Sequence, residues 1–173
     1  MRADHRSECV MNQTVELFGD KWSLLVIRDI IFVDRRHFRE LLTKSMEGIA
    51  SNILADRLHR LIEQGIIVKS DDASHKQKVI YSLTEKGIAL LPLLMEMVIW
   101  GHRFLPDATV KGLARVLEKG GPKLWAEFMA ELRDTHLWAS NATTARRPTK
   151  STRISAMQKL RAAYEPAPAK RKP

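Results

Sequence analysis

Side chains that could catalyse a reaction or hold a metal ion are few and scattered in this sequence. Its six histidines have no metal-ligand spacing, and its one cysteine, Cys9, can form neither an intrachain disulfide nor a Cys-rich zinc site. The sequence contains no HExxH motif, no Gly-rich phosphate loop and no nucleophile elbow. We therefore expect a protein that is not an enzyme and that uses no cofactor and no metal.

Two short polar side chains stand at the start of the segment SNILADRLHRLIEQ, residues 51–64. The apolar residues of this segment recur with helical spacing, which predicts an amphipathic helix closed by Gly65. Ser51 and Asn52 would then lie at the helix N-terminus, where short donors and acceptors can reach base edges or bond a phosphate. The alternative is that they only cap the helix.

The same segment carries three basic side chains away from its apolar stripe. Arg57 and Arg60 could place guanidinium groups on phosphates, and His59 could approach a base. Two alternatives remain open. A helix needs charges on its solvated face in any case, and Arg57 could instead pair with Asp56 or Glu40.

A second basic group falls in the polar stretch SDDASHKQK at 70–78. This stretch separates two β-prone runs, 66–69 and 79–83, so it should form the exposed tip of a hairpin. His75, Lys76 and Lys78 are the residues that such a tip would lay along a nucleic-acid backbone. The alternative is a solvated turn, which the two aspartates of the stretch favour.

Cys9 is open to two interpretations. A thiol near Arg6 or near the start of a helix forms the thiolate more readily, and the thiolate is the form that reacts with oxidants and electrophiles. A lone cysteine is, however, more often a small buried hydrophobic residue. Cys9 is therefore a candidate redox sensor only.

Periodic apolar residues place these groups on a mainly helical chain. Helices are predicted at 12–18, from 21 to about 32, within 37–44 and at 51–64, with an extended segment at 35–38 and a break at Gly19 and Asp20. Thr84 should cap a long helix that Pro92 bends. Two more helices, 109–119 and 122–138, should meet at Gly120, Gly121 and Pro122.

The net charge of +9 is concentrated at the C-terminal end of the chain. Residues 139–173 hold nine Lys and Arg and one acidic residue, a net of +8, whereas residues 1–138 have a net of only +1. The basic end is rich in Ala, Thr and Pro, which predicts a largely disordered tail with a transient helix. Such a tail could bind DNA phosphates without sequence preference or only keep the protein soluble.

The order helix, core helix, short helix, amphipathic helix, hairpin is typical of a winged helix-turn-helix. Across residues 9–105 the sequence resembles the HxlR-type regulators, relatives of the MarR group. The resemblance rests on four strings after Cys9, namely LFGDKWSLLVIRDIIF, RRHFREL, GIASNILADRLHRLIEQGII and YSLTEKG. It implies a dimeric DNA binder whose recognition helix is 51–64 and whose N-terminal and post-hairpin helices form the dimer contact.

We thus expect a mainly α protein with a small β-hairpin wing, α+β in class. Its parts would be a DNA-binding and dimerisation domain at 1–105, a helical extension at 106–138 and the basic tail at 139–173. The expected partners are double-stranded DNA, on a pseudo-palindromic operator, a second copy of the chain, and a small-molecule or electrophile effector. With no apolar stretch of 18 or more uncharged residues and no secretory signal, we expect no membrane contact and a cytoplasmic, nucleoid-associated protein. The rival functions are a winged-helix protein-interaction module and a non-specific DNA binder.

Overall fold

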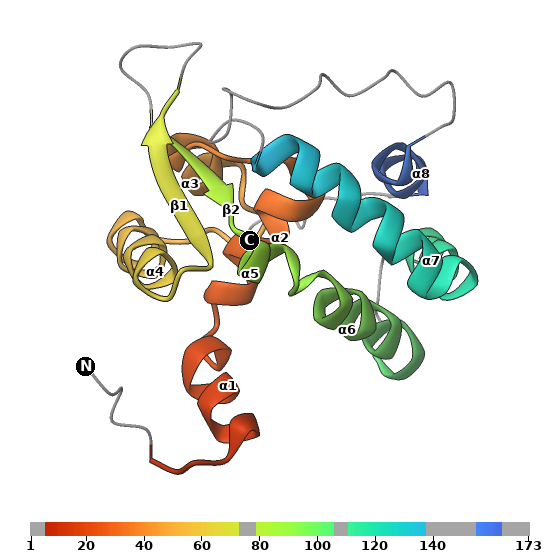
Figure 1. The fold of residues 1–173 in the computed structure, drawn as a ribbon, viewed down its shortest axis with the longest axis horizontal. Helices are drawn as coiled ribbons and strands as arrows, with labels where there is room; N and C mark the ends of the chain where they lie inside the picture. Colours follow the sequence, from red (N-terminus) through yellow and green to blue (C-terminus); the bar gives the residue numbers. More distant parts are fainter. Residues whose placement is uncertain (1–5, 73–78, 106–110, 138–154, 164–173) are drawn as a thin grey trace, which may run out of the picture. The chain divides into compact units, whose positions relative to one another are not determined.

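A computed structural model of the chain describes residues 6–72, 79–105, 111–137 and 155–163. The chain divides into two compact units, residues 1–82 and 83–173, and each is described by itself. The described residues are mostly helical, with one two-stranded sheet, and Figure 1 labels the elements. The predicted fold class, a winged helix-turn-helix with further helices after the wing, is confirmed.

The first unit begins with two helices joined by a tight junction. Helix α1 spans Val10–Phe18 and α2 spans Ser23–Val33. A Cβ atom at Gly19 would come within 2.5 Å of the Val15 carbonyl oxygen, so the turn between the helices requires a residue without a side chain. Helix α2 is the central helix of this unit, because Ile27, Ile30 and Ile31 are fully buried.

The next two helices and the hairpin complete the winged helix-turn-helix. Helix α3 spans Phe38–Lys44 and α4 spans Ser51–Glu63, and the hairpin consists of β1, Ile67–Asp71, and β2, Val79–Leu83. Helix α4 packs on α2, α3 and β1. Of the extended segment predicted at 35–38, Phe38 instead begins α3 and the rest forms no strand, although the Tyr81 amide donates to the Arg36 carbonyl at 2.8 Å and ties this segment to β2.

The second unit starts with a helix that is broken close to its beginning. The Thr84 hydroxyl accepts a hydrogen bond from the Gly87 amide, as predicted for a cap, and α5 covers only Glu85–Ile88. Helix α6, Leu91–Phe104, then begins as a separate helix with Pro92 in its first turn. The missing amide hydrogen of proline costs nothing there, because amides of the first turn have no partner within the helix. The prediction of one continuous bent helix was therefore wrong, because the chain breaks before the proline.

The stretch Glu85–Phe104 is the one part of the described chain that is long and apolar enough to cross a membrane by length and composition. The core helix of a soluble protein passes the same test. Leu91, Met95 and Ile99 are buried in the unit's own core. These contacts favour the role of a core helix for this stretch.

Helix α7, Lys111–His136, and α8, Ala156–Ala163, complete the second unit. Two helical segments meet in α7 at Gly121, which adopts φ 51° and ψ −155°, immediately before Pro122, as the sequence predicted. The helix expected within residues 154–164 of the tail is present at Ala156–Ala163, although it was expected to be only transient. This helix packs on α7, and Ala156 and Leu160 are only 2% and 3% exposed.

Candidate nucleic-acid interface

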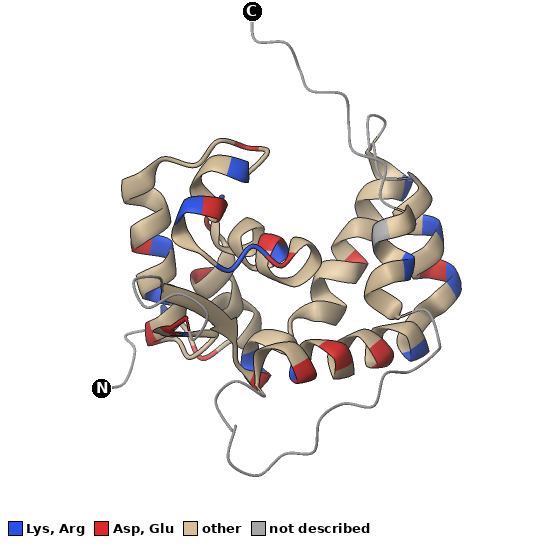
Figure 2. Cartoon of the chain, turned by 90° about the horizontal axis from the view of Figure 1, so that it is seen from above, with Lys and Arg blue, Asp and Glu red and all other residues tan. Residues whose placement is uncertain are grey.

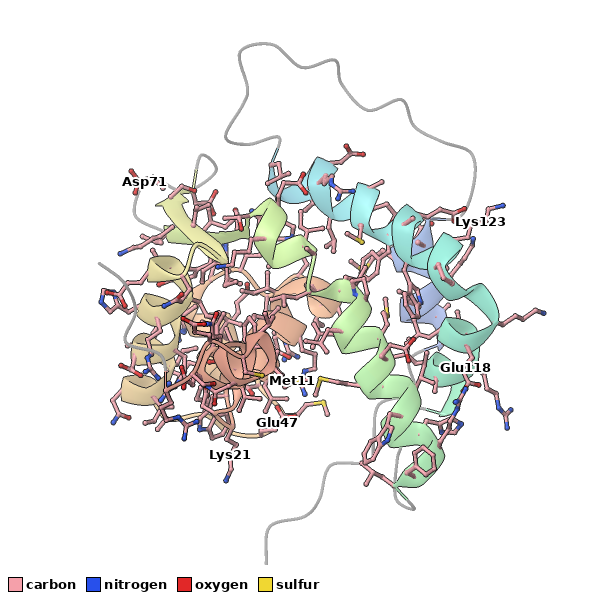
Figure 3. All side chains as sticks on the ribbon, turned by 60° about the horizontal axis from the view of Figure 1, so that its bottom comes forward. Met11, Lys21, Glu47, Asp71, Glu118 and Lys123 are labelled. Atoms are coloured by element: carbon pink, nitrogen blue, oxygen red, sulfur yellow. The ribbon has the colours of Figure 1, made fainter. Side chains whose placement is uncertain are left out.

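Helix α4 presents one buried and one exposed face, as its apolar spacing predicted. Leu54, Leu58 and Leu61 are at most 2% exposed and hold the helix on the core of the first unit. The polar residues of the other face are exposed to solvent, and in Figure 3 their side chains extend outward from α4. The exposed face is therefore free to contact a macromolecule while the buried face keeps the helix in place.

Ser51 and Asn52 are both exposed at the first turn of α4. The residue at the cap position is Ala50, whose backbone is extended and which has no polar side chain, so Ser51 is the first helical residue and not the cap. The alternative that Ser51 and Asn52 only cap the helix is therefore wrong. The first amides of a helix have no partner within the helix, so this turn, with its two exposed side chains, suits a phosphate or a base edge.

His59 and Arg60 lie two turns further along the same face. The His59 ring is 71% exposed, and its Nε2 atom lies 3.3 Å from a carboxylate oxygen of Glu63, one turn on. Arg60 is also exposed. A pair of this kind at the helix surface contributes about 0.3 to 0.5 kcal/mol to stability. A nucleic-acid contact could therefore replace it at little cost.

Arg57 is placed differently, because its side chain is only 17% exposed. Its Nε atom lies 3.5 Å from Oδ1 of Asp20, and its Nη2 atom lies 3.4 Å from Oδ2 of Asp56. The pairing with Asp56 was one of the alternatives predicted from the sequence, whereas the pairing with Asp20 was not predicted.

A buried carboxylate on α2 organises the turn before α4. Asp29 is 3% exposed and accepts hydrogen bonds from Arg28 at 2.7 and 3.0 Å and from Arg35 at 2.9 Å. Arg28 also donates to Glu47, which is labelled in Figure 3, at 2.6 and 2.8 Å. The hydrogen bond from Arg28 outweighs burial and holds the pKa of Glu47 below its usual value. The charged pair in the middle of an apolar helix was the sequence signal for this network.

The base of the wing is fixed by the segment before α3. The Arg36 guanidinium donates to the Tyr81 carbonyl at 3.2 Å and to the Ser82 hydroxyl. His37 Nδ1 lies 2.9 Å from the Val79 carbonyl oxygen, and its Nε2 lies 3.5 Å from a carboxylate oxygen of Asp72. These contacts set the direction in which the hairpin leaves the body of the first unit.

The three predicted wing residues, His75, Lys76 and Lys78, lie outside the residues that the structure describes. Asp71, the last residue of β1, is exposed and is labelled in Figure 3. In the view of Figure 2, both acidic and basic residues lie on the described helices. Residues 1–138 have a net charge of only +1, so we expect the affinity of the first unit for DNA to come from local contacts.

Cys9 is exposed and occupies the cap position of α1. The interpretation of Cys9 as a buried hydrophobic residue is therefore wrong. Arg6, which the sequence analysis considered as its cationic neighbour, instead pairs with Glu16, with Nε 3.0 Å from Oε1. Within the described part of the chain, no group of three or more His, Cys, Asp or Glu residues could hold a metal ion.

Comparison with known proteins identifies the family to which this chain belongs. The model of the HxlR-like helix-turn-helix family matches residues 17–109, more than half of the chain. The HTH-type transcriptional regulator YodB of Bacillus subtilis is 34% identical over 101 residues, which cover 58% of this chain and 88% of YodB. The HTH-type transcriptional regulator Rv3095 of Mycobacterium tuberculosis is 31% identical over 96 residues, 56% of this chain and 59% of Rv3095.

Solved structures show the same relationship. The crystal structure of PA1607 is 36% identical, with a TM-score of 0.53 over 59% of this chain and 70% of that one. A MarR-family protein from Porphyromonas gingivalis is 31% identical, with a TM-score of 0.50 over 60% of this chain and all of that one. The named relatives are transcriptional regulators. The chain belongs to the HxlR-like helix-turn-helix family and is a transcriptional regulator with a helix-turn-helix DNA-binding domain.

Proposed function

We propose that the protein binds a pseudo-palindromic operator as a homodimer, with one α4 helix in the major groove of each half-site. The observation that carries this proposal is the division of α4 into a face anchored by three buried leucines and a polar face that begins at an open N-terminus. A dimer with twofold symmetry places its recognition helices about one helical turn of DNA apart. The operator is then an inverted repeat.

Two exposed apolar surfaces support the proposed dimer. On α1, Val10, Met11 and Val15 are between 51% and 77% exposed. On α6, four large residues at helical spacing form what we term the α6 stripe, with exposures between 41% and 65%, namely Leu93, Met97, Trp100 and Phe104. A row of exposed side chains of this size is typical of a contact between proteins. The dimer contact is assigned to both helices.

Within the interface, Ser51 and Asn52 are assigned to base edges or to a phosphate near the helix N-terminus. His59 is assigned to a base and Arg60 to a phosphate, because both are exposed on the same face. Arg57, which the sequence analysis placed in this set, is better explained by its carboxylate partners. The wing residues His75, Lys76 and Lys78 are assigned to the DNA backbone on the strength of the sequence alone.

The domain assignment from sequence is retained as part of the proposal. Residues 1–105 carry DNA binding and dimerisation, residues 106–138 form a helical extension, and the basic residues from 139 onward add sequence-independent affinity for phosphates. We place the protein in the cytoplasm, on the nucleoid. An effector, either a small molecule or an electrophile, would act by changing the affinity for the operator.

The exposure of Cys9 supports a redox or electrophile response. An exposed thiol can be reached by oxidants and electrophiles. Treatment with diamide or methylglyoxal should change the operator affinity of the wild type and leave that of Cys9→Ser unchanged. An unaltered wild-type affinity would eliminate this response.

The experiment that tests the proposed function is selection of binding sequences from random duplex DNA by the full chain at about 150 mM salt, where loose phosphate contacts are partly suppressed. Enrichment of one inverted repeat is the expected result. Binding without enrichment of any sequence would support the non-specific alternative. The absence of DNA binding would leave the winged helix as a module for docking another protein.

A further inference from the structure

An ion pair links the recognition helix to the junction between α1 and α2. Asp20 lies in that junction, whereas Arg57 lies in the middle of α4, and Nε of Arg57 is 3.5 Å from Oδ1 of Asp20. The side chains are only 17% and 23% exposed, so solvent screens their attraction less than it would on an open surface. This contact indicates that Arg57 helps to hold the recognition helix in position.

Several hydrogen-bond donors fix the position of the Asp20 carboxylate. Its carboxylate accepts hydrogen bonds from the Trp22 amide at 2.7 Å, the Ser23 amide at 3.0 Å and the Ser23 hydroxyl. Burial alone would raise the pKa of Asp20, but these hydrogen bonds and the charge of Arg57 outweigh it and lower the pKa below its usual value. Asp20 is therefore a fixed anion at the start of α2.

In the sequence, Asp20 lies close to the end of α1. Helix α1 ends at Phe18, and the Gly19 amide closes its last turn with a 2.6 Å hydrogen bond to the Val15 carbonyl. The glycine is required there by the close approach of its Cα to that carbonyl. Only one residue, Gly19, therefore separates Asp20 from the end of α1, so a movement of α1 would displace Asp20.

Arg57 is poorly placed to touch DNA. Its charge is balanced by Asp20 and Asp56, and its Nε and Nη1 atoms are buried without a hydrogen-bond partner among the described residues. A guanidinium with buried donors cannot use them on a phosphate outside the protein. Arg60, three residues later on the same helix, is exposed and serves as a matched comparison.

We propose that Arg57 is a positioning residue whose ion pair with Asp20 holds the recognition helix in a fixed place relative to α1. This inference rests on the proposed function, because α1 is there part of the dimer contact. A recognition helix that is fixed relative to the dimer contact is also fixed relative to its counterpart in the other protomer. The Asp20–Arg57 pair thereby sets the half-site spacing that the dimer accepts.

The test measures the binding of full-length variants to the selected operator and to versions with the half-sites moved by one base pair. Arg57→Gln removes the cation. Asp20→Asn removes the anion but keeps an oxygen that can accept from the Trp22 and Ser23 amides. Arg60→Gln is the matched control on the same helix, Arg57→Lys is the conservative variant, and thermal unfolding of each protein shows whether it folds.

Both charge-removing variants should bind the operator about tenfold more weakly, with effects that are not additive in the double variant. Their preference for the selected half-site spacing should become smaller, and their slope of log affinity against log salt should stay unchanged. Arg57→Lys should restore most of the spacing preference. Arg60→Gln should instead lower that slope by about one and keep the spacing preference. A slope lowered by Arg57→Gln, or a spacing preference unaltered in both variants, would overturn the proposal. A wild type that selects no operator would reject the proposed function itself.

Discussion

The guanidinium of Arg28, on α2, makes two hydrogen bonds to the carboxylate of Glu47, at 2.6 and 2.8 Å. These residues are 19 positions apart in the chain, and Glu47 lies in the turn between α3 and α4. Two parallel hydrogen bonds between charged groups fix direction as well as distance. The core helix thus orients the turn from which the recognition helix starts.

Replacing Arg28 should destabilise the first unit. Arg28→Ala leaves the buried carboxylate of Asp29 with Arg35 as its remaining cationic partner and removes the link to Glu47. We expect a loss of about 2 kcal/mol in the free energy of unfolding, since part of the compensation for the buried charge persists. Urea unfolding measures this loss. Lys44→Ala, which breaks an exposed pair with Glu40, should cost no more than about 0.5 kcal/mol; equal losses in both variants would contradict the account.

A charge on the α6 stripe should separate the dimer. Trp100 is 58% exposed, and its ring lies 5.5 Å from that of Phe104. Trp100→Glu would place an unpaired carboxylate in the proposed contact, so the protein should become monomeric and lose most of its operator affinity. Analytical ultracentrifugation gives the mass in solution. Val33→Glu, at an exposed apolar residue on α2, is the control and should remain dimeric.

Acid should destabilise the protein through Asp20 and Glu47. Hydrogen bonds to both carboxylates hold their pKa values in the folded state below the usual ones. Such groups stabilise the fold at a pH above their unfolded pKa of about 4, and this contribution is lost as the pH falls through the lower folded value. The midpoint of urea unfolding should therefore drop below about pH 5. Glu47→Gln should show a smaller drop than the wild type, and an identical pH profile would speak against this role.

The basic tail should add salt-sensitive affinity for DNA. A deletion is a poor test, because it would also remove α8, whose Ala156 and Met157 amides donate to the Glu131 carboxylate at 2.6 and 3.0 Å. Neutralising Arg146 and Arg147 to Gln leaves α8 intact. The slope of log affinity against log salt should then fall by up to about 0.9 for each phosphate that the tail no longer neutralises.

The control for this experiment is a pair of exposed lysines on α7, Lys119 and Lys123. Their replacement by Gln removes the same net charge, so it separates a local contact from a general effect of charge. If both pairs lower the slope equally, the tail has no contact of its own. If neither does, its basic residues serve only solubility.

The arrangement of the winged helix-turn-helix was predictable from the sequence because its helices are strongly periodic. The spacing of Leu54, Leu58 and Leu61 gave both the position of α4 and its buried face, and the structure places its start at the predicted residue. The Gly121 and Pro122 pair likewise marked the kink in α7. Local patterns of this kind are determined within a few residues of the chain.

Features that depend on residues far apart in the chain were harder to predict. Nothing in the sequence pairs Asp20 with Arg57, because the contact exists only once α4 has packed on the first unit. The helix α8 was expected from the sequence, but its packing on α7, with Leu160 buried, was not. The candidate DNA contacts themselves remain predictions.

The most direct test of the account is the operator affinity of a variant that lacks the two short polar side chains at the start of α4. Ser51→Ala and Asn52→Ala together should leave the unfolding free energy within about 0.5 kcal/mol of the wild type, because both residues are exposed. Fluorescence anisotropy with the selected operator and with a shuffled duplex should show at least a tenfold loss on the operator, consistent with about 1 to 3 kcal/mol per good base contact, and little change on the shuffled DNA. An unchanged operator affinity would contradict the claim that α4 reads the sequence through its first turn.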